Sequence, residues 1–158
     1  YNNNSELNSI RKFGRMYNYF AVIDSRNLAP TGWHVATSND WNKLTDYLKN
    51  NLGISRSVAQ ALASKTDWSE SAFQNSIGSL DPDTFMPINN TSGFAALPGG
   101  IRAEYGIFIA VGVYGAWWVA GESTVNNADF RSLNNYGTTM GKNTYNKTYG
   151  LSVRCVKD

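Results

Sequence analysis

The sequence predicts an α+β fold made of two helices, several short strands and long loops. One segment repeats apolar residues at helical spacing, while other short segments alternate apolar and polar residues or are rich in aromatics, as strands are. Between Asp67 and Asn90 neither period is present, and Ser, Asn, Asp, Pro and Gly dominate. A chain of 158 residues is expected to form one domain, at residues 14–158.

The N-terminal part predicts an arm followed by two strands. Residues 1–13 begin with Tyr-Asn-Asn-Asn-Ser and carry little pattern, so we expect an N-terminal arm. Residues 17–22 are aromatic and β-prone, which predicts a first strand. After the turn-forming residues 24–27, the segment 30–35 predicts a second strand, with a close bend permitted by Gly32.

Two helices follow. Thr37 is expected to be the N-cap of the first helix, because Asp40 lies three residues later, where its carboxylate can accept a hydrogen bond from the Thr37 backbone N–H and complement the helix dipole. Apolar residues then recur at helical spacing until Gly53 ends the element; they are Trp41, Leu44, Leu48 and Leu52. Residues 57–64 predict a shorter helix.

The second half predicts a long loop and then strands. The loop between Asp67 and Asn90 is expected to be functional or held down by other parts of the protein. Residues 94–102 predict a strand entry and a glycine turn. Strands are expected at residues 106–113 and 116–120, joined at Tyr114-Gly115. The terminal segment alternates Leu151, Val153 and Cys155 with polar residues, which predicts a strand with one buried face.

Composition excludes several classes of protein. The net charge of +2 is too small and dispersed for a nucleic-acid interface, and no apolar run is long enough to insert into a membrane. Cys155 is the only cysteine, so an intrachain disulfide and a zinc site of paired cysteines are impossible. A polarity built from Asn, Ser, Thr and Gly is typical of exported β-rich domains that bind carbohydrate or protein.

No catalytic motif is present, and the residues that could take part in catalysis are interpreted as structural. His34 is the only histidine and is interpreted as a hydrogen-bonded structural residue, since no suitable nucleophile accompanies it. Cys155 is interpreted as an inert core thiol. No metal site is predicted. The carboxylates of Asp81 and Asp83 could coordinate calcium, although a turn with solvated carboxylates explains this pair as well.

The segment 126–146 is the candidate binding surface. It is rich in Asn, Thr and Tyr, which supply contact area and adaptable hydrogen bonding, but its composition fits a solvated hairpin loop equally well. Trp33, Trp41 and Trp117 are assigned to the core. The aromatics assigned to a face that meets a partner are Trp118, Phe130, Tyr136 and Tyr145. Trp117 and Trp118 are expected to point to opposite sides of their strand.

Several motifs together resemble the Fibrobacter succinogenes major paralogous domain, found in exported proteins of Bacteroidetes. They run in order from about Gly14 to the C-terminus: Gly-Arg-Met-Tyr-Asn-Tyr-Phe-Ala-Val at 14–22, Pro-Thr-Gly-Trp-His-Val at 30–35, Asp-Trp at 40–41, Ser-Gly-Phe-Ala-Ala-Leu-Pro-Gly-Gly-Ile-Arg at 92–102, Trp-Trp at 117–118 with Glu-Ser at 122–123, and Tyr-Gly-Leu-Ser-Val-Arg-Cys-Val at 149–156.

The resemblance implies a C-type-lectin-like fold, with two helices, small antiparallel sheets, long loops and paired terminal strands. Members of the family commonly carry a cysteine before the Pro-x-Gly-Trp-His motif, paired with the cysteine of the terminal strand. Here that position is Ala29, so Cys155 is expected to be single and the core alone to hold the domain. The catalytic cysteines of the related formylglycine-generating enzymes and the calcium signatures of mammalian lectins have no counterpart, which implies no enzymatic activity and no calcium-dependent sugar binding.

The same fold is used by the variable proteins of diversity-generating retroelements, in which mutable codons precede the terminal strand. By that resemblance residues 129–146 are expected to be a variable, ligand-binding region. The candidate ligand-binding residues are Trp118, Asp129, Phe130, Ser132, Asn134, Tyr136, Thr138, Asn143 and Tyr145.

The predicted function is a receptor-binding or adhesin-type module of a bacterial surface protein or a phage tail. The expected location is therefore extracellular, on a cell surface or on a virion. The expected partner is a protein or glycan receptor on a cell surface, and a homo-oligomer is left open. The alternative is a structural or assembly domain of a bacterial surface protein without a specific ligand site.

Overall fold

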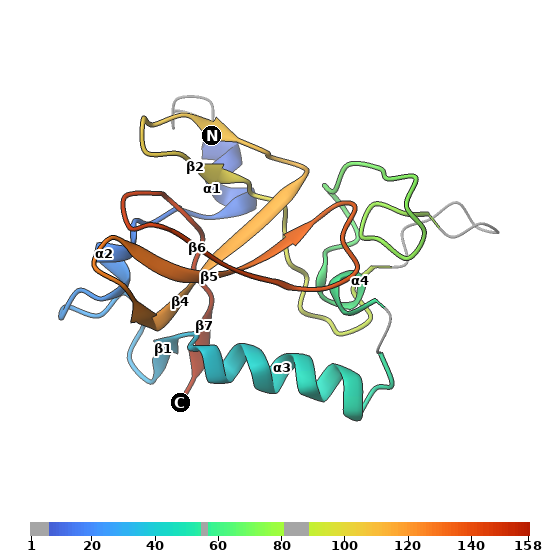
Figure 1. The fold of residues 1–158 in the computed structure, drawn as a ribbon, viewed down its shortest axis with the longest axis horizontal. Helices are drawn as coiled ribbons and strands as arrows, with labels where there is room; N and C mark the ends of the chain where they lie inside the picture. The colour runs from blue at the N-terminus through green and yellow to red at the C-terminus, as the bar shows by residue number, and fades with distance from the viewer. Residues whose placement is uncertain (1–6, 55–56, 81–88) are drawn as a thin grey trace.

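The computed structural model describes residues 7–54, 57–80 and 89–158, and these form an α+β fold with few helices and small antiparallel sheets (Figure 1). The largest sheet crosses the middle of the molecule. Helix α3 runs along one side of it, helix α1 and strand β2 lie toward the opposite end, and the loop-rich part with α4 lies beside the sheet (Figure 1). The predicted fold class, at this level, is confirmed.

The central sheet contains β4 (Tyr114–Ser123), β5 (Asn127–Asn134) and β6 (Gly141–Asn146), in the order β4-β5-β6. Both pairings are antiparallel, and their register places Trp118 opposite Phe130 and Phe130 opposite Asn143. The pairing of β4 with β5 is irregular between Trp118 and Ser123. The segment 126–146 is therefore mainly a pair of strands, and β5 is the central strand of the sheet.

Two hydrophobic clusters lie on the two sides of this sheet. Adjacent side chains of a strand point to opposite faces, so Trp117 joins one cluster and Trp118 the other. The Trp117 cluster includes Trp41 and Leu48 of α3. In the other cluster, Trp118 meets Phe130 edge-on at 6.3 Å between ring centroids. The predicted opposite orientation of the two tryptophans is confirmed, and both side chains are core.

Helix α3 (Ser38–Asn50) begins where the sequence predicts. The Thr37 hydroxyl accepts from the Asp40 N–H, and the Asp40 carboxylate accepts from the Thr37 N–H at 2.9 Å, which completes a capping box. Trp41 and Leu48 are the buried residues of this helix. The second predicted helix is present as α4 (Val58–Leu62), while residues 67–80 and 89–90 of the predicted loop contain no helix or strand.

The C-terminal segment joins the two ends of the described chain. β7 (Cys155–Lys157) pairs antiparallel with β1 (Trp33–Val35), and Leu151 bridges Tyr17. Ser152 continues this path by bridging Trp117 of the central sheet. The predicted terminal strand is present only at Cys155–Lys157, where it pairs with an N-terminal strand as expected. Of its predicted buried face, Leu151 is fully buried but forms an isolated bridge outside β7, while Val153 and Cys155 are half-buried.

Three features of the N-terminal part differ from the sequence-based expectations. Residues 17–22 do not form a strand, because the Asn18 side chain accepts a hydrogen bond from the Ala21 N–H and begins the one-turn helix α2 (Tyr19–Val22). The expected patternless arm contains the helix α1 (Leu7–Phe13). Trp33, expected in the core, has 41% of its surface exposed.

The predicted turn at Tyr114-Gly115 is also wrong, because these residues begin β4. A Cβ atom at Gly115 would lie 2.9 Å from the Leu97 carbonyl oxygen and 2.5 Å from the Trp117 ring, so this glycine permits close packing. The turn lies earlier, where Ala110 and Gly112 have positive φ values. It follows the short strand β3 (Phe108–Ile109), which pairs with β2 (Ile101–Arg102).

Ala29 and Cys155 pack in the same hydrophobic cluster, Ala29 buried and Cys155 half-buried at its edge. Burial raises the pKa of the Cys155 thiol, which keeps it protonated at neutral pH.

We expect the melting temperature of the domain to be the same with and without reductant, because a single cysteine cannot form an intrachain disulfide. Differential scanning calorimetry measures this, and a lower melting temperature under reductant would contradict it.

The burial of Trp118 predicts a large difference between two tryptophan substitutions. Trp118 is fully buried and its Nε1 donates to the Tyr17 carbonyl at 2.8 Å, whereas Trp33 is partly exposed. Trp118→Ala should lower the free energy of unfolding by about 3–5 kcal/mol. Trp33→Ala, the matched control, should cost clearly less. Urea denaturation followed by circular dichroism measures both, and equal costs would show that Trp118 is not a core residue.

Candidate functional site

A shallow polar groove lies between the start of α3 and the strands β5 and β6. Its volume is about 340 Å³. We call it the polar groove, and its lining residues are Ser38, Asn42, Asp129, Arg131, Lys142, Asn143 and Thr144. All of them are polar or charged, and they come from one helix and two strands that are distant in the sequence.

Regular secondary structure fixes the positions of these side chains. Strand pairing places Arg131 opposite Lys142 and Asp129 opposite Thr144. Both cations are tied to α3: Lys142 Nζ donates to Asn42 Oδ1 at 3.2 Å, and Arg131 Nη2 donates to Ser38 Oγ at 3.3 Å. Since the capping box holds the start of α3, the groove has a rigid backbone on both sides.

Of the nine candidate ligand-binding residues, Asp129 and Asn143 line the polar groove. Asn143 is exposed, and its Nδ2 donates to the buried Ser132 Oγ at 3.3 Å. Because Asn143 is paired with Phe130 while Lys142 is paired with Arg131, the Asn143 side chain lies on the face of the sheet opposite the two cations, so its amide is directed away from the groove. Asp129 is half-buried on the neighbouring strand. The structure thus brings together two candidates and adds five groove residues that were not predicted.

Tyr136 and Thr138 lie in the turn between β5 and β6, away from the polar groove. Tyr136 is 58% exposed, and its ring centroid lies 6.4 Å from that of Phe73, which is also exposed. Asn134 is half-buried at the end of β5, and its Oδ1 has no hydrogen-bond partner among the described residues. These three residues do not line the polar groove.

Tyr145 lies at the other end of β6, in a stack of three rings. Its ring centroid is 4.5 Å from that of Phe130 and 4.9 Å from that of Tyr149, with nearly parallel planes. Burial in this stack raises the pKa of the Tyr145 hydroxyl. Tyr145 and Tyr136 therefore do not share one face, as a single aromatic binding patch would require.

Three candidates are buried, and the expectation that their side chains are displayed to a ligand is wrong. Trp118 is fully buried, Phe130 is 1% exposed and Ser132 is 3% exposed. For Phe130 and Ser132 the cause is the central position of β5, since strands cover both of its edges and hydrophobic clusters cover both faces; Trp118 of β4 is buried in one of these clusters. The sequence resembled a polar loop there, although Ala128-Asp129-Phe130 already alternates in the manner of a strand.

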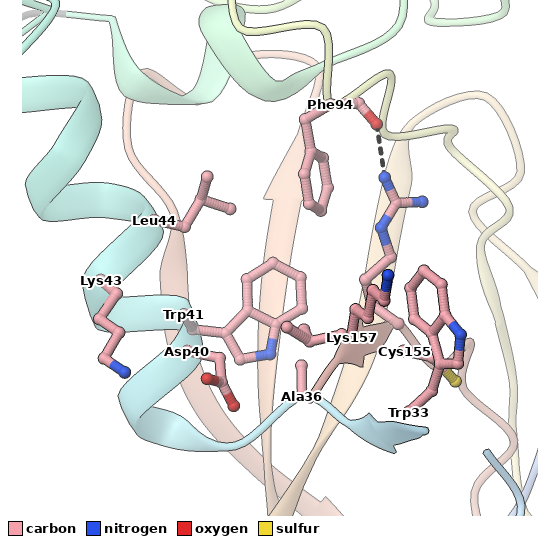
Figure 2. A pocket seen from close by; sticks show the side chains of 11 residues that line it. Trp33, Ala36, Asp40, Trp41, Lys43, Leu44, Phe94, Cys155 and Lys157 are labelled. Carbon is pink, nitrogen blue, oxygen red and sulfur yellow. Dashed lines mark hydrogen bonds between the residues drawn. The ribbon is translucent and has the colours of Figure 1, made fainter. Parts of the chain in front are cut away.

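A second, apolar groove lies on the other side of α3, beside β7 (Figure 2). Its volume is about 410 Å³. We call it the apolar groove, and its lining residues are Trp33, Ala36, Asp40, Trp41, Lys43, Leu44, Phe94, Arg154, Cys155, Val156 and Lys157. No local sequence pattern predicts it, because its residues come from three distant segments.

Aromatic rings and a cation form one wall of the apolar groove. The rings of Trp41 and Phe94 lie 5.7 Å apart between centroids, with Phe94 above Trp41 in Figure 2. The Arg154 guanidinium carbon lies 4.1 Å from the Phe94 ring centroid. Its Nη2 donates to the Phe94 carbonyl at 2.8 Å, the dashed bond in Figure 2.

The chain matches the Fibrobacter succinogenes major domain over residues 1–157. It belongs to this family. The match includes residues 1–13, which the sequence patterns had set apart as an arm. No curated protein and no solved structure matches the chain. None of the helices formed by the described residues has the length and apolar character needed to cross a bilayer.

His34 of this Fibrobacter succinogenes major domain connects three elements near the apolar groove. Its Nδ1 lies 2.6 Å from Asp158 Oδ1, and its Nε2 lies 3.1 Å from Asp40 Oδ2. The hydrogen bond to Asp158, and to a smaller extent the hydrogen bond to Asp40, raise the pKa of His34. The Thr37 hydroxyl is the main cause that lowers the pKa of Asp40 to about 2. His34 is thus hydrogen-bonded through both ring nitrogens, as the sequence indicated.

Asp81 and Asp83, the candidate calcium ligands, lie outside the described residues. Within residues 7–54, 57–80 and 89–158, no group of three or more His, Cys, Asp or Glu side chains is placed to hold a metal ion.

The histidine contacts predict a pH dependence of stability. A raised pKa in the folded protein means that protonated His34 contributes stability that is complete below the unfolded pKa of about 6.5 and is lost as pH rises through the folded pKa. The free energy of unfolding should therefore exceed that of His34→Gln most at pH 6 and least at pH 9. Urea denaturation at each pH measures the difference.

An NMR titration provides the control, because the chain contains a single histidine. The pKa of His34 should lie above 6.5 and should fall in Asp158→Asn, which removes the larger of the two causes. A pKa at or below 6.5 in the unmodified protein would contradict the contacts.

Proposed function

We propose that this domain is a non-enzymatic module that binds a protein or glycan receptor outside the cell, through the polar groove. The observation that carries the proposal is the convergence of polar side chains from α3, β5 and β6 around one groove, on backbone held by strand pairing and by a capped helix. Such a frame lets side chains make recognition contacts while the backbone stays fixed.

The chemistry of the polar groove favours a neutral polar ligand. Asp129 supplies a carboxylate, Arg131 and Lys142 supply cations, Asn42 supplies an amide, and Thr144 supplies a hydroxyl that both donates and accepts hydrogen bonds. Because both charge signs are present and both cations have partners on α3, a strongly charged ligand gains little there. Hydroxyl groups of a glycan or amides of a protein surface match this set of donors and acceptors.

The chain belongs to the Fibrobacter succinogenes major domain family, and the resemblance on which the expectation of an exported protein with a C-type-lectin-like fold rests runs through the same residues. We include in the proposal a location on a bacterial surface or a virion, as an adhesin-type or phage-tail component, and diversification of residues 129–146 by a retroelement. Diversification is compatible with an intact core only at exposed or half-buried positions, such as Tyr136, Thr138 and Asn143. Sister copies should therefore differ there and retain Phe130 and Ser132.

Binding should depend on Asp129 and Thr144, which lie opposite each other on β5 and β6 in the groove. Fluorescent tetramers of the domain are applied to a glycan array and to intact bacterial cells, and binders are titrated. On a surface that binds the unmodified domain, Asp129→Ala/Thr144→Ala should weaken binding by roughly tenfold, because two polar ligand contacts are lost. Asn50→Ala, an exposed asparagine at the far end of α3, is the matched control.

Unchanged binding by the double variant, with its circular dichroism spectrum intact, would exclude the polar groove as the site. Absence of binding to every glycan and cell surface would favour the second candidate function.

The second candidate is an assembly domain, and the hairpin formed by β2 and β3 favours it. Alternate residues of this hairpin and the turn after it are large, apolar and exposed: Tyr105 at 86%, Ile107 at 60%, Ile109 at 44% and Val111 at 44%. Exposed apolar rows of this kind mark contacts with another protein. Self-association that Ile107→Lys abolishes, measured by sedimentation equilibrium, would support assembly as a homo-oligomer.

A further inference from the structure

We propose that the apolar groove beside β7 is a second binding site, which takes an extended peptide segment with an apolar side chain flanked by acidic residues. Three features of the groove carry this inference: its apolar floor, its unpaired cations and the open edge of β7. The site is separate from the polar groove, because α3 stands between the two.

The floor of the apolar groove fits one apolar side chain. Trp41 is buried at its base, Leu44 lies on the α3 side and Phe94 covers it from above, as Figure 2 shows. Trp33 borders it on the β1 side with 41% of its surface exposed. A volume of about 410 Å³ with so many aromatic walls lies in the size range of pockets that bury an apolar ligand group.

The charge around the groove is positive and uncompensated. Lys43, Arg154 and Lys157 line it, and none of them forms an ion pair with a carboxylate of the described residues. The only carboxylate among the lining residues is that of Asp40, which is occupied by the capping box and by His34. Desolvation also lowers the pKa of Arg154, so an anion beside its guanidinium would be stabilised.

The backbone of β7 offers hydrogen bonds to an extended chain. β7 pairs with β1 alone, and that pairing uses alternate residues: Ala36 N–H donates to the Arg154 carbonyl and Asp158 N–H donates to the Gly32 carbonyl. In an antiparallel pair, the residues between these direct their N–H and C=O groups to the other edge. Within the described part of the chain, the N–H groups of Cys155 and Lys157 have no backbone acceptor there.

Together these features specify a peptide rather than a compact small molecule. A segment that adds to an exposed strand edge gains affinity from main-chain hydrogen bonds and specificity from the pocket that receives one of its side chains. An apolar side chain would enter between Trp41 and Phe94, and acidic neighbours would meet the three cations. Complementary charge would also speed the encounter and make it sensitive to salt.

The test uses three fluorescein-labelled heptapeptides, titrated with the whole chain and followed by fluorescence anisotropy. The first has a central Phe flanked by Asp on both sides. In the second the Asp residues are Lys, and in the third the Phe is Ala. We expect the first peptide to bind and the other two to bind much more weakly, with affinity for the first falling as salt is added. Equal binding of all three, or of none, would overturn the proposal.

Variants locate the site. Lys43→Gln/Lys157→Gln should weaken binding of the first peptide roughly fivefold, the size expected from losing two partly exposed ion pairs. This change removes no hydrogen bond or ion pair among the described residues, so it should leave folding intact. Arg26→Gln is the matched control, since Arg26 is an exposed cation paired with Asp24, and it should leave binding unchanged.

Two further measurements separate this site from the polar groove. Asp129→Ala/Thr144→Ala should leave affinity for the peptide unchanged. In ¹H–¹⁵N spectra, the amide signals of Cys155 and Lys157 should shift as peptide is added, and their exchange with deuterium should slow. Shifts confined to β5 and β6 would show that the peptide binds elsewhere, and would overturn the proposal.

Discussion

The register between β4 and β5 is the constraint on which most of this structure depends. It sets Trp118 opposite Phe130 on one face of the sheet, and Trp117 opposite the buried Arg131 on the face toward α3. A slip of one residue would move Phe130 toward the helix and place the Arg131 guanidinium in the cluster that contains Trp118. Both hydrophobic clusters and the polar groove thus depend on this strand pairing.

Helix α3 borders both grooves and separates them, because different faces of the helix line each one. Ser38 and Asn42 are four residues apart, so they lie on one face of the helix and meet the strands in the polar groove. Lys43 and Leu44 lie on a different face and border the apolar groove. Since the capping box fixes the start of the helix, both surfaces have a rigid common wall.

The two grooves differ most in how their charges are satisfied. In the polar groove, Arg131 and Lys142 donate hydrogen bonds to α3, and Asp129 balances part of their charge. In the apolar groove the cations surround aromatic rings, and the one carboxylate is held by the helix cap and by His34. A neutral polar ligand therefore suits the first surface, and an anionic ligand with an apolar part suits the second.

The sequence alone determined the features that local interactions control. The capping box of Thr37 and Asp40, the helical spacing of Trp41 and Leu48, and the alternation that begins at Leu151 are all set within a few residues along the chain. Family membership was also readable, because its motifs are contiguous. The opposite faces of Trp117 and Trp118 follow directly from strand geometry.

Tertiary structure alone decided what is exposed. Phe130 and Ser132 are in a polar stretch, and only the position of β5 between β4 and β6 shows that both are buried. Tyr19 lies in a helix rather than a strand because the Asn18 side chain caps the helix. Residue propensities, which favour a strand for this aromatic segment, do not show that this cap forms. Both grooves combine α3 with strands about a hundred residues away, and no local pattern encodes that proximity. Burial is a property of packing between distant segments, so the site could be recognised only once they were placed together.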